Sequence, residues 1–306
     1  MRVFVAGATG AIGRALLPQL TAVGHEPIAM TRSAQKADAL RARGIEACVC
    51  DAYDAPGLQR AVADARPERI VHLLTDLPAD INMRRFEREL ASTGRLRREG
   101  TANLIAAATA AGVRGVIGES IAFAYAAEGE RVKEEDAPLA AAGLPAIVGP
   151  LAELERRLLD AGGIVLRYGQ LYGPGTAFAG DGSWPANLRR RRLPIVGAGS
   201  GVFSFVHVED AASATVAALA HEGPATYNVV DDEPAPISEW LPVYTRIVGA
   251  PAPWRVPAWV GRLAAGPVAV EMMNELRGAS NARIKRELGW QPRYASWRQG
   301  FAQALG

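Results

Sequence analysis

The sequence has little of what would indicate a disulfide scaffold, a charged binding surface or a membrane anchor. It contains two cysteines, Cys48 and Cys50, which lie too close together on one predicted strand for ordinary disulfide geometry. So few cysteines favour a reducing compartment. The formal net charge is only +2, which argues against nucleic acid or a membrane surface as a partner. No apolar run approaches the roughly 20 residues that span a bilayer. Because residues 2–6 are already strand-like, we expect a cytoplasmic protein with no signal peptide.

What the sequence does contain is an alternation of strand and helix patterns through its first half. Short apolar runs predict strands at residues 2–6, 27–30, 45–50, 69–74, 113–118 and 163–167. Helical periodicity predicts helices at residues 11–23, 34–43, 56–65, 81–111 and 150–161. Such alternation is typical of a Rossmann-type α/β fold with a doubly wound parallel sheet.

The pattern changes after Arg167, where glycine and proline cluster at residues 172–175 and 197–201. A strand is predicted at residues 202–208, and an alanine-rich helix is predicted at residues 209–220. The last predicted helix lies near residues 281–288. We expect a nucleotide-binding domain over residues 1–170, to which residues 202–220 return, and a smaller substrate-binding lobe over residues 171–306.

The segment GATGAIG at residues 7–13 follows the first predicted strand and opens the first predicted helix. In that context glycines allow a tight turn and a close approach of the backbone to a pyrophosphate. The helix N-terminus adds free N–H groups and a partial positive charge. An ordinary glycine-rich turn is the alternative. We assign dinucleotide contacts to Gly7, Thr9, Gly10, Ala11, Ile12 and Gly13.

The second predicted strand ends without the acidic residue that would bind the ribose 2′-hydroxyl of NAD. Arg32 instead offers a fork suited to a 2′-phosphate, and Lys36 follows one turn later, so the sequence predicts NADP rather than NAD. A solvated arginine at a loop start is the alternative. The remaining predicted cofactor contacts follow the strand ends: Ser33, Asp51, Ala52, Leu73, Leu74 and Thr75. Asp51 would meet the adenine, although Asp is also a common turn residue.

With these motifs the chain resembles the extended short-chain dehydrogenases/reductases, the NAD(P)-dependent epimerase/dehydratase family. The resemblance covers nearly the whole chain and includes GTANL at residues 100–104, LRYGQLYGPG at 166–175, FVHVEDA at 205–211, YNV at 227–229 and KRELGWQP at 285–292. It implies an N-terminal Rossmann domain, an active site between that domain and a small substrate lobe, and homodimers built on the helices near 81–111 and 150–161.

The sequence departs from this family at the catalytic pair. The resemblance implies Tyr-x-x-x-Lys near the start of the helix at 150–161, but none of the three lysines lies four residues after a tyrosine. If Glu155 is the family's glutamate, Ile147 and Leu151 occupy the two places. The usual proton-transfer mechanism therefore does not carry over.

Other side chains of the expected cleft are candidates for the missing role. Ser120 follows the fifth strand, where the resemblance implies a substrate-bonding hydroxyl, although a turn serine is the alternative. Tyr125 is the best replacement proton donor, although a core tyrosine is equally consistent. Tyr168 is expected at the nicotinamide, and Gln170 and Tyr172 at the substrate. His207 is expected to be a hydrogen-bonded structural residue, and the remaining histidines show no metal spacing.

Two arginine-rich segments need an interpretation. The run at residues 189–192 is typical of a solvated face, with an anionic substrate group as the alternative. The arginines within residues 84–98 are expected on the exposed face of the long helix.

The sequence thus predicts an NADP-dependent oxidoreductase of an atypical extended type that acts on a small metabolite. The alternatives are an epimerase, isomerase or dehydratase, for example of a nucleotide sugar, and a non-catalytic NADP sensor.

Overall fold

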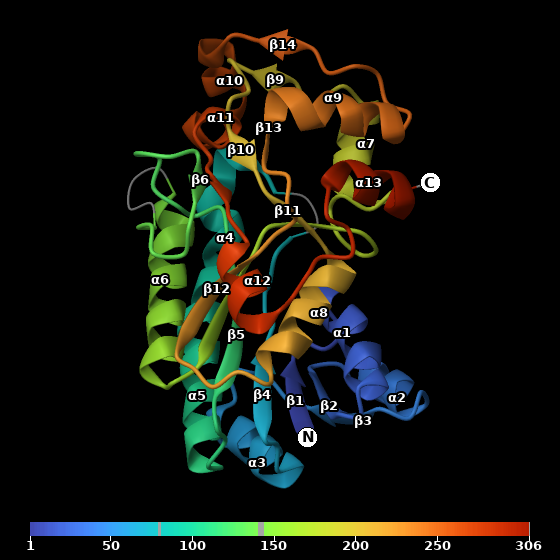
Figure 1. Ribbon diagram of the computed structural model, residues 1–306, viewed down its shortest axis with the longest axis vertical. Helices are drawn as coiled ribbons and strands as arrows, with labels where there is room; N and C mark the ends of the chain where they lie inside the picture. Colours follow the sequence, from blue (N-terminus) through green and yellow to red (C-terminus); the bar gives the residue numbers. More distant parts are fainter. Residues whose placement is uncertain (79–80, 140–143, 306) are drawn as a thin grey trace.

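Seven parallel strands form the central sheet of the protein (Figure 1). The computed structural model describes residues 1–78, 81–139 and 144–305. The strand order is β12-β7-β5-β4-β1-β2-β3. Their bounds are β1 Arg2–Ala6, β2 Glu26–Thr31, β3 Glu46–Val49, β4 Arg69–His72, β5 Val116–Ile121, β7 Ile164–Tyr168 and β12 Ala225–Val229. The order reverses direction between β4 and β1, the point at which ligands bind in open α/β sheets.

Helices cover both faces of this sheet, which confirms the doubly wound fold. One face carries α1 (Ala11–Ala22), α2 (Ala34–Arg41) and α8 (Val208–Ala218). The other carries α3 (Ala55–Ala65), α5 (Thr101–Ala110) and α6 (Pro145–Asp160). Leucines at helical spacing are fully buried on each side, for example Leu16 and Leu20 of α1 and Leu154 and Leu158 of α6. Burying each such side chain stabilises the fold by about 1.5–3 kcal/mol.

The long helix predicted at residues 81–111 is several elements in succession. A 3₁₀ turn, η1 (Met83–Arg85), leads into α4 (Phe86–Arg95), and a π-helical turn, η2 (Leu96–Gly100), joins α4 to α5. A π turn inserts one residue and so shifts the phase of the helix faces. As a result Arg97 is buried, with 6% of its surface exposed, whereas its neighbour Arg98 is exposed. The prediction that all arginines of this segment are exposed is therefore wrong for Arg97.

Helix α6 begins five residues earlier than predicted. Pro145 occupies its first turn, where the missing N–H has no helical partner to lose. Pro150 lies inside the helix rather than at its start. The apolar residues Ile147, Val148 and Leu151 consequently belong to the helix and face inward.

The C-terminal part of the chain lies at the carboxyl ends of the sheet strands (Figure 1). The strand predicted at residues 202–208 is two short strands, β10 (Val202–Phe203) and β11 (Phe205–His207), which pair with β13 (Ala235–Pro236) and β8 (Gln170–Tyr172). Neither strand joins the main sheet; the later strand β12 does. Helix α8 nevertheless packs against α1, on the main sheet. The division of the chain into two domains at residue 170 stays a prediction.

An aromatic core holds this C-terminal part together. Phe205, Trp240, Tyr244, Trp297 and Phe301 are all fully buried. Their elements include α9 (Ile237–Ile247) and α13 (Trp297–Leu305), the latter a helix that the sequence did not predict. The other elements are β6 (Val132–Lys133), α7 (Ser183–Arg189), β9 (Ile195–Val196), β14 (Arg255–Val256), α10 (Ala258–Ala265), α11 (Pro267–Asn274), β15 (Gly278–Ala279) and α12 (Ala282–Leu288). Across the described ranges, no helix is long and apolar enough to cross a membrane.

Candidate active site

The glycine turn between β1 and α1 has the shape that a dinucleotide requires. Gly7 has φ +94°, and a Cβ on it would lie 2.5 Å from the carbonyl oxygen of Leu73. A Cβ on Gly13 would lie 2.5 Å from the carbonyl oxygen of Gly7. Gly10 caps α1 without a side-chain hydrogen bond, and the first turn of the helix holds no acidic residue. The free N–H groups of that turn are therefore available to a phosphate.

The ends of β2 and β3 lie beside this turn, at the same edge of the sheet. Arg32 and Lys36 are both exposed, and neither side chain has a partner among the described residues. Ser33 is the N-cap of α2 and accepts a hydrogen bond from the Lys36 backbone N–H at 3.3 Å. Asp51 is half-buried and accepts from the Tyr53 backbone N–H at 2.9 Å. These contacts leave both cationic side chains free to meet an anionic ligand.

The other predicted cofactor residues also lie at this edge. Leu73, Leu74 and Thr75 follow β4, and Ala52 follows β3, where its carbonyl accepts a hydrogen bond from Asn103. Tyr168 ends β7 on the face covered by α1 and α8, and its hydroxyl lies 2.7 Å from that of Thr215. Burial raises the pKa of Tyr168, so this phenol stays protonated at neutral pH. The structure therefore brings all of the predicted cofactor residues to the carboxyl ends of the strands.

Ser120 and Tyr125 both belong to a buried hydrogen-bond network. The Ser120 hydroxyl donates to Glu155 Oε1 at 2.5 Å, and Arg167 donates to both oxygens of the same carboxylate at 2.9 and 2.7 Å. Arg167 Nη1 also donates to the Tyr125 hydroxyl at 2.9 Å, which in turn donates to Asn228 Oδ1 at 2.6 Å. None of these residues exposes more than 6% of its surface.

The electrostatics of the network favour a structural role for these hydroxyls. Burial is the largest single influence on the pKa of Arg167 and lowers it, but the hydrogen bonds and charge attraction to Glu155 and Tyr125 together raise that pKa. Burial also raises the pKa of Tyr125, against the opposing effect of Arg167. Each hydroxyl donates its hydrogen to a partner inside the protein, Ser120 to Glu155 and Tyr125 to Asn228. The catalytic assignment of Ser120 and Tyr125 stays a prediction.

Ile147 and Leu151, which stand at the places of the catalytic pair if Glu155 is the family's glutamate, lie in an apolar cluster. Ile147 is 6% exposed and Leu151 is fully buried, and they pack with Phe86, Leu90 and Ala124. Ile81, Met83, Ile121, Leu139, Val268 and Met272 lie partly buried around this cluster. No side chain at these two positions can donate or accept a proton.

Of the predicted substrate contacts, only Gln170 has accessible surface. Tyr172 is fully buried, packs edge-on against Phe301, and its hydroxyl has no partner within the described part of the chain. His207 Nδ1 accepts a hydrogen bond from the Glu209 backbone N–H and caps α8, which confirms a structural role. The arginines at residues 189–192 are exposed at the end of α7.

Sequence reasoning missed an ion pair between Arg97 and Glu119. Arg97 Nη2 lies 3.4 Å from Glu119 Oε1, and both side chains are buried. Burial raises the pKa of Glu119, while Arg97 opposes that shift. The sequence held a signal for this pair: Glu119 directly continues the apolar strand pattern of residues 113–118, and a buried charge there needs a partner. The π turn that points Arg97 inward has no such signal.

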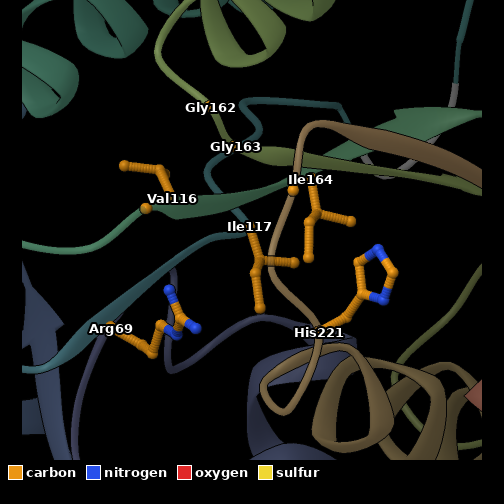
Figure 2. A pocket seen from close by; sticks show the side chains of 9 residues that line it. Arg69, Val116, Ile117, Gly162, Gly163, Ile164 and His221 are labelled. Carbon is orange, nitrogen blue, oxygen red and sulfur yellow. The ribbon is translucent and has the colours of Figure 1, made fainter.

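A small cavity lies at the opposite edge of the sheet, where Val116 and Ile164 begin β5 and β7 (Figure 2). Arg69 and His221 also line it, and its volume of about 10 Å³ has room for one water molecule. It is too small for a substrate.

The fold and the glycine turn agree with the comparisons with known proteins. The chain belongs to the NAD dependent epimerase/dehydratase family, which matches residues 3–230. A "3-diazoavenalumate denitrifying reductase" of a Streptomyces species is 44% identical over 314 residues, covering 99% of this chain and 100% of that protein. A UDP-glucose 4-epimerase of Mycolicibacterium smegmatis is 29% identical and covers 96% of this chain and 95% of its own.

Solved structures show the same fold. The UDP-glucose 4-epimerase of Thermotoga maritima with UDP-glucose matches with a TM-score of 0.77 at 20% identity, over 99% of this chain and 97% of that one. The Thermus thermophilus UDP-glucose 4-epimerase in complex with NAD matches with a TM-score of 0.76 at 24% identity, over the same shares. The protein is therefore an enzyme of a family that works with a nicotinamide dinucleotide.

Proposed function

We propose that this protein is an NADPH-dependent reductase that replaces a diazo group of a small aromatic substrate with hydrogen. The observation that carries the proposal is the apolar cluster at Ile147 and Leu151, which removes the family's means of moving a proton. The 44% identical relative supports it, because its name describes a reductase that removes the nitrogen of a diazo compound.

The chemistry of such a reduction needs no proton from the protein. NADPH held at the glycine turn would supply a hydride. In net terms, an arenediazonium ion and a hydride give an arene and dinitrogen: one C–H bond forms with the hydride electron pair, and the C–N electron pair leaves with N₂. Charge balances, since the substrate loses one positive charge and the dinucleotide gains one. A general acid, which typically contributes about 10²–10⁴-fold in rate, has no step to serve.

The chain's own residues then act by binding and by excluding water. The turn at Gly7 and the N-terminus of α1 would hold the pyrophosphate, and Arg32 with Lys36 would hold the 2′-phosphate. The partly buried side chains around the apolar cluster, among them Ile121 and Met272, would keep water from the reacting carbon. Excluding water matters because diazonium ions also react with it.

An epimerase is the less suitable alternative. Oxidation of a sugar hydroxyl requires a group that takes its proton as the hydride leaves, and Ile147 and Leu151 cannot do so. The structural likeness to UDP-glucose 4-epimerases, below 25% identity, reflects the fold they share.

The experiment incubates the protein with NADPH and 3-carboxybenzenediazonium and follows the loss of NADPH together with the formation of benzoate. A reaction without protein corrects for direct reduction of the diazonium ion by NADPH. We expect enzyme-dependent formation of one benzoate per NADPH. A parallel incubation with UDP-glucose and NAD⁺ tests the epimerase alternative. Formation of UDP-galactose, or tight NADPH binding with no turnover of any arenediazonium, would contradict the proposal.

A further inference from the structure

The ion pair between Arg97 and Glu119 lies level with the glycine turn at the ligand-binding edge of the sheet. His72, the last residue of β4, pairs in register with Ala6 of β1 and with Gly118 of β5. Gly7 and Glu119 are therefore each the first residue after the paired row of Ala6, His72 and Gly118. With two strand spacings between β1 and β5, they are separated by about 10 Å.

Glu119 faces the same side of the sheet as the predicted nicotinamide contact. Residues alternate along a strand, so Glu119 shares its face with Ile117, which packs with the α1 and α8 side chains. Glu119 also contributes to the raised pKa of Tyr168, whose hydroxyl lies against α8. Arg97 lies in η2, in the helix layer on the other face of the sheet. It can contact Glu119 because β4 ends at His72, which pairs with Gly118, the residue before Glu119.

Arg97 has hydrogen-bond capacity that the protein does not use. Of its five N–H donors, Nη2 meets Glu119 at 3.4 Å, at the long end of hydrogen-bond distances. Its Nε is buried and has no partner among the residues that the structure describes. An unpaired buried donor is costly, so its retention needs an explanation, such as a role in the chemistry of the site or a bound water or ion.

We propose that Arg97 binds an anionic oxygen of the substrate, a carboxylate or a phenolate carried by a planar conjugated group, while Glu119 holds Arg97 in place between substrates. This inference rests on the proposed function and names its substrate class. Ile121 lies two residues beyond Glu119 in β5, and this partly buried apolar side chain would contact the planar group. An anionic oxygen and the guanidinium would then pair beside the reacting carbon.

The roles of the two residues predict opposite effects of their substitution. Removing the guanidinium removes the attraction for the anion. Neutralising Glu119 removes both a competitor for Arg97 and a repelling charge, so the Glu119→Gln variant should bind the anion more tightly. A purely structural ion pair would give neither effect, because loss of either partner would change only the stability of the fold.

The test measures dissociation constants by ligand-observed NMR on the full chain in the presence of NADP⁺, so that turnover plays no part. The probes are cinnamate and its neutral isostere cinnamamide, and 4-nitrophenolate with 4-nitroanisole. We expect one of the anions to bind about 10- to 100-fold more tightly than its neutral counterpart, the range of a charged hydrogen bond. The first pair reports a carboxylate site and the second a phenolate site.

Variants assign the preference to the ion pair. Arg97→Met should abolish it, Arg97→Lys should keep part of it, and Glu119→Gln should increase it several-fold. Arg98→Met is the matched control, because Arg98 is the exposed neighbour on the same turn, and it should change nothing. If Arg97→Met does not fold, Arg97→Lys and Glu119→Gln still decide the matter.

The proposal is overturned if neither anion is preferred, or if the preference is the same in wild type, the Arg97 variants and Glu119→Gln. A protein that binds the anion through Arg97 but reduces no arenediazonium refutes the proposed function and leaves this site standing. The two failures are therefore distinguishable.

Discussion

Replacing Tyr125 with phenylalanine removes one hydroxyl from the centre of the buried network and leaves the ring in place. The hydroxyl donates to Asn228 at 2.6 Å and accepts from Arg167 at 2.9 Å. After its loss Arg167 Nη1 still donates to the Glu135 carbonyl oxygen, whereas Asn228 Oδ1 has no other donor among the described residues. A buried acceptor without a donor costs about 1–3 kcal/mol.

We therefore expect the Tyr125→Phe variant to lose about 2 kcal/mol of its unfolding free energy and to keep its turnover. Urea denaturation measures the first quantity, and NADPH consumption with an arenediazonium measures the second. If Tyr125 were instead the general acid, as the sequence suggested, turnover would fall by about 10²–10⁴-fold. The NADPH dissociation constant should be unchanged in either case.

Tyr53→Phe is the control for this experiment. Tyr53 is half-buried, its ring lies under the Arg95 guanidinium, and its hydroxyl makes no hydrogen bond within the described ranges. Its loss should change stability by less than about 0.5 kcal/mol. A Tyr125→Phe variant that is as stable as the control but inactive would refute the structural role.

Three further predictions concern the cofactor, pH and assembly. In calorimetric titrations the wild type should bind NADPH more tightly than NADH. Arg32→Ala should reduce this ratio of affinities by about 10- to 100-fold, whereas Arg43→Ala, at an exposed arginine, should leave the ratio unchanged. Equal affinities of the wild type for NADPH and NADH would refute the role of Arg32. His72 is fully buried, and burial lowers its pKa from 6.5 to about 4. Because His72 is harder to protonate in the folded than in the unfolded state, its contribution to the unfolding free energy is complete above pH 6.5. Roughly 3 kcal/mol of that free energy is lost as the pH falls towards 4. Urea titrations at several pH values should show that loss in wild type and not in His72→Gln. We also propose a homodimer across α4 and α6, whose outward faces carry charged side chains such as Arg88 and Arg156. Light scattering at micromolar protein concentration should show the dimer, and a monomer there would count against it.

The parts of the fold that local sequence determines could be predicted. The strands ending at Ala6 and His72 are short apolar runs, and the helix after Gly10 follows a turn that only glycines permit. Because those features involve neighbours along the chain, residue types and spacing suffice to place them. The position of the candidate cofactor residues at one edge of the sheet could also be predicted, since parallel strands bring their carboxyl ends together there.

The parts that depend on distant contacts could not be predicted. Ser120 and Tyr125 were candidates because both follow the strand predicted at residues 113–118; in the structure Ser120 lies within β5 and only Tyr125 follows it. Their hydroxyls donate to Glu155 and Asn228, which lie 35 and 103 residues away. Arg97 was assigned to the exposed face of one long helix together with the other arginines of residues 84–98, and the π turn directs it inward. Conversely, Ile147 and Leu151 were correctly seen to lack proton-transfer chemistry, because that conclusion requires only their identity.

The central claim is that the protein delivers hydrogen as a hydride and moves no proton to the carbon. The most direct test incubates the protein with 3-carboxybenzenediazonium and NADPH that carries deuterium at both positions of nicotinamide carbon 4, in ordinary water. A second reaction uses unlabelled NADPH in D₂O. The account predicts one deuterium on the ring carbon that held the nitrogen in the first reaction and none in the second. Deuterium that enters that carbon from D₂O, or enzyme-dependent product without label from NADPH, would contradict it.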